Sequence, residues 1–172
     1  MNYYEIPSKS IIVDELLEIA NNNEAWTVHD SVEMKFPPLE LLTKDPLIKF
    51  LSSRYKSRGN IFRFRPYSCF DWHKDRVRQI TINLVLTPSV RSFCVFSDGK
   101  AKSMLRGIGD YVFDVEELVY KPNTYYAFNS QVPHSVYNFE DTRYLFNLEF
   151  YDEDLWVPFK DMVSVIEKEF NS

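Results

Sequence analysis

The sequence predicts a mainly β fold, either a sandwich or a small barrel, with α-helices packed against its outside. Three observations support this prediction. Between Asn60 and Tyr151 apolar residues recur with a period of two, in seven short segments. Turn residues bound each segment, as is typical of short antiparallel strands. Two segments before Asn60 and one after Val157 show helical spacing instead, so we expect helices there.

The chain has 172 residues, a length that suits one domain over residues 1–172. We expect helices and strands over 1–60, the β core over 61–151 and a closing helix over 158–170. Hydrophobic residues make up 45% and charged residues 26%, which argues against a disordered chain. There is no signal-peptide pattern and no long apolar run, so we expect a cytoplasmic protein with no membrane partner.

The first sixty residues should form three elements before the β core. These are a helix over 8–22, a strand over 25–36 and a helix from 46 to about 55. Ser8 or Ser10 can cap the first helix. Asp45 should cap the second, with Pro46 in its first turn, and Arg58-Gly59-Asn60 should end it.

The seven β segments of the core cover 61–67, 78–87, 91–97, 116–122, 124–129, 134–138 and 143–151. In the last segment Arg143 and Asn147 share one face, and the residues between them give an apolar face. That apolar face should pack on the helices, which turns Arg143 and Asn147 toward the interior. By the same alternation Asn83 should face the interior, unless its strand lies at a wet edge. A buried guanidinium needs an anion, and a carboxylate fits its planar fork.

The net charge of −5 is distributed unevenly along the chain. Nine bases and three acids lie between residues 61 and 106, which gives +6 there and −11 for the remainder. The basic stretch is either a solvated face or a mouth that attracts anions. The overall excess of acids argues against a nucleic-acid partner.

Two of the three histidines stand in a pattern that suits a metal ion. On an extended chain the side chains of His73 and Asp75 point the same way, and a barrel can bring His134 beside them. Two imidazoles and one carboxylate on one face form the facial triad of non-haem Fe(II) oxygenases, which leaves open positions on the metal. His29 stands apart, and we expect it to be a surface or packed residue.

The order of these motifs resembles the Fe(II)/2-oxoglutarate-dependent dioxygenases over residues 61–151. H-x-D is followed by hydrophobic strands, a proline-bearing turn, His134 and then Arg143 nine residues on. The H-x-V-x-N run at 134–138 resembles the aspartyl/asparaginyl β-hydroxylase branch, and the whole pattern also resembles prolyl-hydroxylase-like members. The resemblance implies a double-stranded β-helix, a jelly-roll core like that of cupins. Asp75 is a departure from the β-hydroxylase members, which lack the acidic ligand.

The resemblance also implies cofactors and a reaction. His73, Asp75 and His134 would bind Fe(II), and Arg143 would hold the distal carboxylate of 2-oxoglutarate. Further candidates for contact with this cosubstrate are Asn83 and, ranked lower, Arg78. With O2, such an enzyme would hydroxylate a C–H bond of an amino-acid, peptide or small-molecule substrate.

Three residues could line the substrate side of such a site: Tyr67, Trp72 and Arg63. The alternative for the two aromatic residues is packing in the barrel, and the alternative for Arg63 is a solvated position. The segment 97–114 is either a lid or a variable loop. At the turn before the strand at 124–129, Asn123 stands where the family often has glycine, and asparagine tolerates the left-handed conformation.

Two other functions compete with the oxygenase. A cupin-type metal-binding isomerase or epimerase would use the same barrel, but it usually has a third histidine near the first pair, and only His29 remains. A non-catalytic β-sandwich binding module would have no metal affinity and no use for a buried Arg143.

Overall fold

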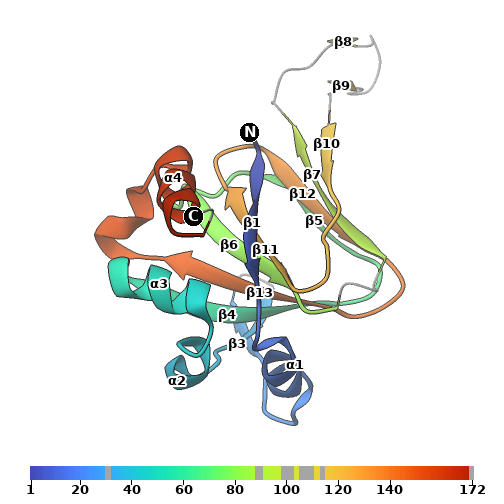
Figure 1. Ribbon diagram of the computed structural model, residues 1–172. Helices are drawn as coiled ribbons and strands as arrows, with labels where there is room; N and C mark the ends of the chain where they lie inside the picture. The colour runs from blue at the N-terminus through green and yellow to red at the C-terminus, as the bar shows by residue number, and fades with distance from the viewer. Residues whose placement is uncertain (30–31, 88–90, 98–102, 105–110, 113–114, 171–172) are drawn as a thin grey trace.

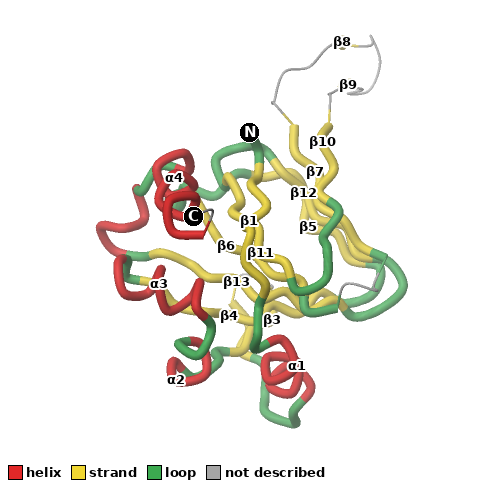
Figure 2. Tube along the Cα trace, in the orientation of Figure 1, coloured by secondary structure: helices red, strands yellow, loops and turns green. Residues whose placement is uncertain are grey.

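The computed structural model describes residues 1–29, 32–87, 91–97, 103–104, 111–112 and 115–170. Two β-sheets face each other, and the helices gather on the outer side of the larger sheet (Figures 1 and 2). The larger sheet has the order β1 (Tyr3–Lys9), β11 (Thr124–Asn129), β6 (Ile80–Val85), β13 (Arg143–Phe150), β4 (Ser57–Phe64), β3 (Val32–Lys35) and β2 (Thr27–His29). The smaller sheet has the order β10 (Val115–Leu118), β7 (Ser92–Ser97), β12 (His134–Asn138) and β5 (Ser68–His73). The short strands β8 (Ser103–Met104) and β9 (Tyr111–Val112) pair with each other.

The helices are α1 (Val13–Asn21), α2 (Leu39–Leu42), α3 (Pro46–Arg54) and α4 (Phe159–Phe170), with a 3-10 turn η1 (Asp152–Trp156). The predicted mainly β fold with helices outside it is therefore confirmed, as is the closing helix. Asp45 caps α3 as expected: its carboxylate accepts hydrogen bonds from the backbone N–H of Leu47 at 3.0 Å and of Ile48 at 3.3 Å. No helix in the described part of the chain has the length and apolar character needed to cross a bilayer.

Alternation in the central strands separates two apolar cores. Ile80, Ile82 and Leu84 point from β6 toward the helices and are fully buried. Asn83 points the other way, into the space between the sheets, as the sequence predicts. There Tyr126 and Phe128 of β11 pack against Phe96 of β7. The molecule thus has a helix-covered core and a second, partly polar interior between its sheets.

The first predicted helix is wrong in its extent. Residues 3–9 form the edge strand β1, which pairs with β11 and buries Ile6. The helix α1 starts only at Val13, and no side chain caps it, neither Ser8 nor Ser10. The pairing of residues 3–9 with β11 outweighs the helical preference of the local sequence. Burial along a sheet edge depends on residues that are distant in the chain.

Two further boundaries differ from the prediction. The segment 25–36 is a hairpin and not one strand: Thr27 pairs with Met34 and His29 with Val32, and residues 30–31 lie outside the described part. The triplet Arg58-Gly59-Asn60 does not end a helix but lies inside β4. The sheet therefore extends beyond the core that the sequence predicts from residue 61.

Gly59 is needed where β4 passes close to α2 and β13. A Cβ atom at this position would come within 2.6 Å of Leu42 Cδ1 and 2.6 Å of Phe146 Cε2, both on buried side chains. We expect Gly59→Ala to lower the free energy of unfolding by about 1–3 kcal/mol, measured by urea denaturation, because the core is overpacked. Adding Phe146→Leu should recover part of the loss, and an unchanged urea midpoint for Gly59→Ala would contradict this account.

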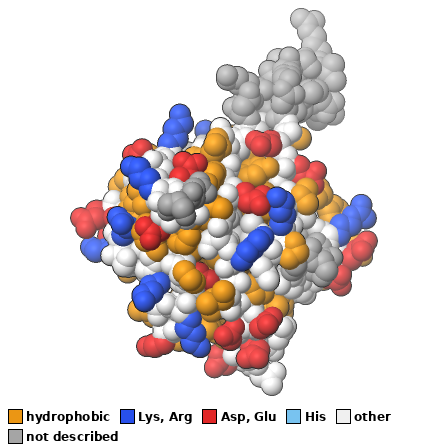
Figure 3. Space-filling model, in the orientation of Figure 1, with side chains coloured by type: hydrophobic (Ala, Val, Ile, Leu, Met, Phe, Trp, Pro, Cys, Tyr) orange, Lys and Arg blue, Asp and Glu red, His pale blue; other side chains and the backbone are white. Residues whose placement is uncertain are grey.

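On the face seen in Figure 3, acidic and basic side chains are interspersed, without a continuous area of one sign. The segment 97–114, for which the sequence leaves a lid or a variable loop open, lies largely outside the described residues. The expected left-handed turn is confirmed, since Asn123 has a φ of 53°.

Candidate metal centre

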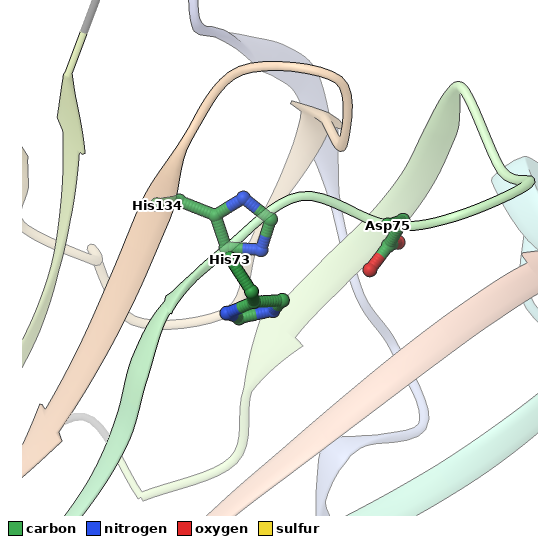
Figure 4. A group of neighbouring side chains, drawn as sticks. All are labelled: His73, Asp75 and His134. Atoms are coloured by element: carbon green, nitrogen blue, oxygen red, sulfur yellow. The ribbon is translucent and has the colours of Figure 1, made fainter. Parts of the chain in front are cut away.

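The two sheet-borne histidines of the H-x-D…H pattern lie side by side. His73 ends β5 and His134 begins β12, and the two residues are direct partners across these antiparallel strands. Their ring centroids are 4.2 Å apart. Asp75 follows β5 by two residues, and its carboxylate points toward the two imidazoles (Figure 4). One donor atom from each of the three side chains lies within 4.8 Å of the others.

Both imidazoles are oriented by backbone carbonyl groups. His73 Nδ1 lies 2.6 Å from the carbonyl oxygen of Asp71, and His134 Nδ1 lies 2.8 Å from that of Val132. A carbonyl oxygen only accepts hydrogen bonds, so Nδ1 of each ring carries the proton. The Nε2 atoms then keep free lone pairs, which is the arrangement found in most histidine ligands of metals.

His134 is buried at the end of the inter-sheet core. Its ring packs edge-on against Phe128, with centroids 4.8 Å apart, and near Phe96. Burial lowers the pKa of His134 to about 4. The imidazole is therefore neutral near pH 7, which is the protonation state that a metal ligand requires.

An ion-pair chain fixes the carboxylate of Asp75. Arg78 Nη2 donates to Asp75 Oδ2 at 3.0 Å, and Arg78 Nη1 donates to Glu149 on β13. The backbone N–H of Asp75 donates to the carbonyl of Ser130 at 3.0 Å. The side-chain amide of Gln131 donates to the carbonyl oxygens of Asp75 and Arg78. Arg78, a lower-ranked cosubstrate candidate in the sequence, is thus engaged by two carboxylates.

Arg78 should position Asp75 for a metal. We expect Arg78→Ala to raise the Kd for Fe(II) by about 10–100-fold, the usual cost of removing a residue that orients a metal ligand. Anaerobic titration calorimetry would measure the change. Arg58→Ala is the matched control, because Arg58 also pairs with Glu149, at 3.2 Å, but has no contact with Asp75 in the described structure. Equal Kd values for wild type and Arg78→Ala would contradict this role.

Arg143 points into the interior of the structure, as its strand position predicts. Its side chain is 0% exposed and lies over the rings of Tyr120 and Phe64, at 4.9 Å and 5.4 Å from their centroids. None of its three guanidinium nitrogens has an acceptor in hydrogen-bonding geometry among the described residues, although the Tyr120 side chain is near enough to interact with the charge. Burial raises the pKa of Tyr120, so this neighbour is a neutral phenol and not a counter-ion. A buried charge in this state calls for an anionic ligand.

Three asparagines form a row across the interior face of the larger sheet. Asn147 of β13 is the direct partner of Asn60 on β4 and of Asn83 on β6. The Asn147 amide donates to Asn83 Oδ1 at 2.6 Å. Both polar side-chain atoms of Asn60 and the Oδ1 of Asn147 are buried without a partner in the described structure. The row therefore offers free donors and acceptors on the face that also carries Arg143.

The sequence does not single out several of these residues. Asn60 reads as a turn residue within Arg-Gly-Asn, and its interior position becomes visible only through its pairing with Asn147. Glu149 follows Asn147 by two residues and so shares its face of the strand, but nothing in the sequence indicates its contact with Arg78. Tyr120 could have been found only as an aromatic residue at the end of a predicted strand.

Asn138, the last residue of the H-x-V-x-N run, has a bracing role. Its side-chain amide donates to the carbonyl oxygens of Phe64 at 3.3 Å, Arg65 at 2.8 Å and Asp141 at 2.7 Å. These bonds connect β12 of the smaller sheet to the end of β4 in the larger one. Asn138 therefore ties the end of β12 that is opposite His134 to the larger sheet.

The predicted substrate-lining residues lie outside the barrel. Tyr67 is 80% exposed and Trp72 is 40% exposed, so the alternative of barrel packing is wrong for both. Arg63 donates to Glu33 at 2.6 Å in a surface groove that also includes Phe70, the ring neighbour of His73. Hydrogen bonds from Arg63 and Arg65 lower the pKa of Glu33 to about 2. The His29 side chain is outside what the structure describes, but its strand β2 is the edge of the larger sheet.

No family model matches the chain, and no curated protein matches it in sequence. Solved structures do share its fold. A prolyl-4-hydroxylase from Pseudomonas putida is 13% identical with a TM-score of 0.57, and the match covers 88% of this chain and 93% of that one. The non-haem alpha ketoglutarate dependent epimerase SnoN from nogalamycin biosynthesis is 12% identical with a TM-score of 0.57, over 86% of this chain and 75% of its own.

An oxidoreductase of the 2OG-Fe(II) oxygenase family from Burkholderia pseudomallei is 13% identical with a TM-score of 0.53, covering 86% of this chain and 84% of that one. SnoN has also been solved in complex with Fe3+, alpha ketoglutarate and nogalamycin RO. At such low identities these similarities establish the architecture. The fold of this chain is the double-stranded β-helix, or jelly roll, that these enzymes share.

Proposed function

We propose that the chain is a non-haem Fe(II)- and 2-oxoglutarate-dependent dioxygenase that hydroxylates a C–H bond of an amino-acid, peptide or small-molecule substrate. One observation carries the proposal. A cluster of two imidazoles and a carboxylate lies at a barrel whose interior holds a buried guanidinium that finds no acceptor among the described residues. The donor set suits Fe(II), and the guanidinium suits the distal carboxylate of 2-oxoglutarate.

Each residue of the site has a distinct role in this proposal. His73, Asp75 and His134 would hold Fe(II), and Arg78 orients Asp75. Arg143 would bind the cosubstrate, and the row formed by Asn60, Asn147 and Asn83 offers amide groups to the same interior. Bound iron and 2-oxoglutarate supply the oxidising chemistry with O2. The aromatic residues around His134 exclude water from one side of the cluster.

The position of the chain within this class is part of the proposal. The run from His134 to Asn138 supports a relation to the aspartyl/asparaginyl β-hydroxylase branch, and Asp75 supports prolyl-hydroxylase-like members. We further infer a cytoplasmic location, because Cys69 and Cys94 are free thiols, which suits a reducing compartment.

The competing functions are less well supported. A redox-inactive cupin site would use a third histidine, but within the described residues the cluster contains only His73, Asp75 and His134. A non-catalytic binding module gives no reason for an interior Arg143 that has no acceptor among the described residues.

Uncoupled turnover tests the proposal directly. With Fe(II), 2-oxoglutarate and O2, the purified protein should release succinate slowly even without its substrate. His73→Ala should stop this release, and His29→Ala, which changes the remaining histidine, should leave it intact. Metal-loaded wild-type protein that releases no succinate under any of these conditions would contradict the proposed reaction.

A further inference from the structure

We propose that the substrate of this site is an extended, acidic polypeptide segment that adds as a further strand to the free edge of β5. The inference rests on the proposed function, because it names the substrate of that same site. It rests on three features of the surface beside His73: an unpaired strand edge, an adjoining groove and a surplus of positive charge.

Within the described residues no strand pairs with the outer edge of β5. β5 is the last strand of the smaller sheet, whose order is β10-β7-β12-β5. The four residues from Cys69 to Trp72 are all exposed. The carbonyl oxygen of Phe70 accepts a hydrogen bond from Ser135 Oγ of β12 at 2.8 Å, so this peptide group faces inward. By alternation the backbone groups of Cys69 face outward, where an added strand would bind them.

The same strand leads directly to the candidate metal centre. His73 is its last residue, and the ring of Phe70 packs edge-on against that of His73 with centroids 4.4 Å apart. The pairing of β5 with β12 is irregular between Phe70 and His73. There the Asp71 carbonyl contacts His73 Nδ1 and the Trp72 N–H donates to Asp71 Oδ1, so an added strand would pair at Cys69. Because a strand advances about 3.3 Å per residue, the cluster begins about four residues beyond that pairing point. Trp72, which is 40% exposed, lies between these two positions.

A groove of about 280 Å³ adjoins the edge and could take a side chain of the added strand. One wall is formed by Ser68, Cys69 and Phe70 of β5, and the other includes Val28 and Val32. The exposed parts of Phe70 and Val28 make this groove partly apolar. In strand addition, main-chain hydrogen bonds give affinity and such side-chain pockets give specificity.

The charges around the edge favour an acidic partner. Lys74 and Arg76 are exposed on either side of Asp75, and neither forms an ion pair with a described residue. In the groove Glu33 is already engaged by Arg63 and Arg65, and the side chain of Arg65 remains 73% exposed. The only acid in the exposed part of β5 is Asp71. Four bases (Arg63, Arg65, Lys74 and Arg76) thus stand against three acids (Glu33, Asp71 and Asp75). Complementary charge promotes encounter and sets register.

Binding of a probe peptide tests the inference without turnover. The probe has six residues, the length of β5, with alternating valine and glutamate. We expect it to bind wild-type protein in fluorescence anisotropy and to slow amide exchange in β5. The same peptide with alternate amides N-methylated should bind at least about tenfold more weakly, because it cannot form the strand ladder. A valine–lysine peptide should also bind at least about tenfold more weakly.

Variants of the edge complete the test. The double variant Lys74→Glu/Arg76→Glu should reverse the preference between the two charged peptides, and Trp72→Ala should weaken both. The double variant Lys44→Glu/Lys49→Glu, near and in α3, should change neither. Thermal unfolding of each variant confirms that it is folded. The inference would be overturned if wild-type protein did not bind the valine–glutamate probe. It would also be overturned if the N-methylated peptide, or a mixture of free valine and glutamate, bound as tightly as the probe.

Failure here can be distinguished from failure of the proposed function. Succinate release by a protein that does not bind the probe would leave the oxygenase standing and remove the peptide substrate. If the protein binds the probe at β5 but never releases succinate, the proposed peptide-binding edge stands and the proposed oxygenase reaction is wrong.

Discussion

Replacing Asp75 by alanine should abolish Fe(II) binding at physiological metal concentrations. The carboxylate is the only anionic member of the described cluster, and the two imidazoles alone offer an incomplete and neutral site. Loss of a residue that only orients a ligand typically costs about 10–100-fold in metal affinity, so loss of the ligand itself should exceed that range. Anaerobic titration with Fe(II), or with Co(II) as a spectroscopic substitute, would measure it.

Controls separate ligand loss from misfolding. Asp75→Asn keeps the shape of the side chain but removes its charge, and it should lose metal almost as completely as Asp75→Ala. Asp71→Ala is the matched control, since Asp71 is an exposed acid at β5 whose side chain is no part of the cluster. Full metal affinity in Asp75→Ala would contradict the triad and favour a site built on other residues.

The second large effect concerns Arg143. We expect Arg143→Met to raise the Kd for 2-oxoglutarate by about a hundredfold or more, because the buried carboxylate of the ligand would lose its charge partner. The Kd for Fe(II) should change far less. Titration of each ligand separately, under anaerobic conditions, would show the split.

The same variant should have an opposite effect on the protein alone. In the described structure Arg143 is a buried charge without an acceptor, and replacing such a charge by an apolar side chain is often neutral or stabilising. Arg143→Met should therefore unfold at the same or a higher temperature than wild type without ligand, and 2-oxoglutarate should raise the unfolding temperature of wild type alone. Arg63→Ala, whose guanidinium binds Glu33 at the surface, is the control for loss of an arginine. A destabilised Arg143→Met with normal 2-oxoglutarate affinity would give Arg143 a structural role.

Strand periodicity was sufficient to predict the side chains that face the interior. The position of Arg143 and Asn147 follows from alternation in one strand, and the structure buries both between the sheets. Asn83 follows from the same argument in β6. An extended chain is sufficient to predict that His73 and Asp75 point the same way. The approach of His134 follows only if the chain returns, as in a barrel, to the strand that bears His73.

Features that depend on distant pairing could not be predicted in this way. β1 contains Pro7, which disfavours a strand interior. It is a strand only through its pairing with β11, more than a hundred residues later in the chain. β5 lacks a clear alternation because its residues are exposed at an edge, so the sequence pattern does not predict the strand that bears His73. Gly59 and Asn60 have the local signature of a turn, and only the contacts of β4 with β13 make them part of the sheet. In each case the deciding contact lies many residues away in the chain.

The visible spectrum of the wild-type protein with Fe(II) and 2-oxoglutarate, recorded without oxygen, tests most directly whether this triad binds iron together with the cosubstrate. We expect a weak charge-transfer band that needs both additions, persists in His29→Ala and is lost in His73→Ala, Asp75→Ala and His134→Ala. Protein that binds Fe(II) with these three residues intact, yet shows no band at any concentration of 2-oxoglutarate, would contradict this joint binding.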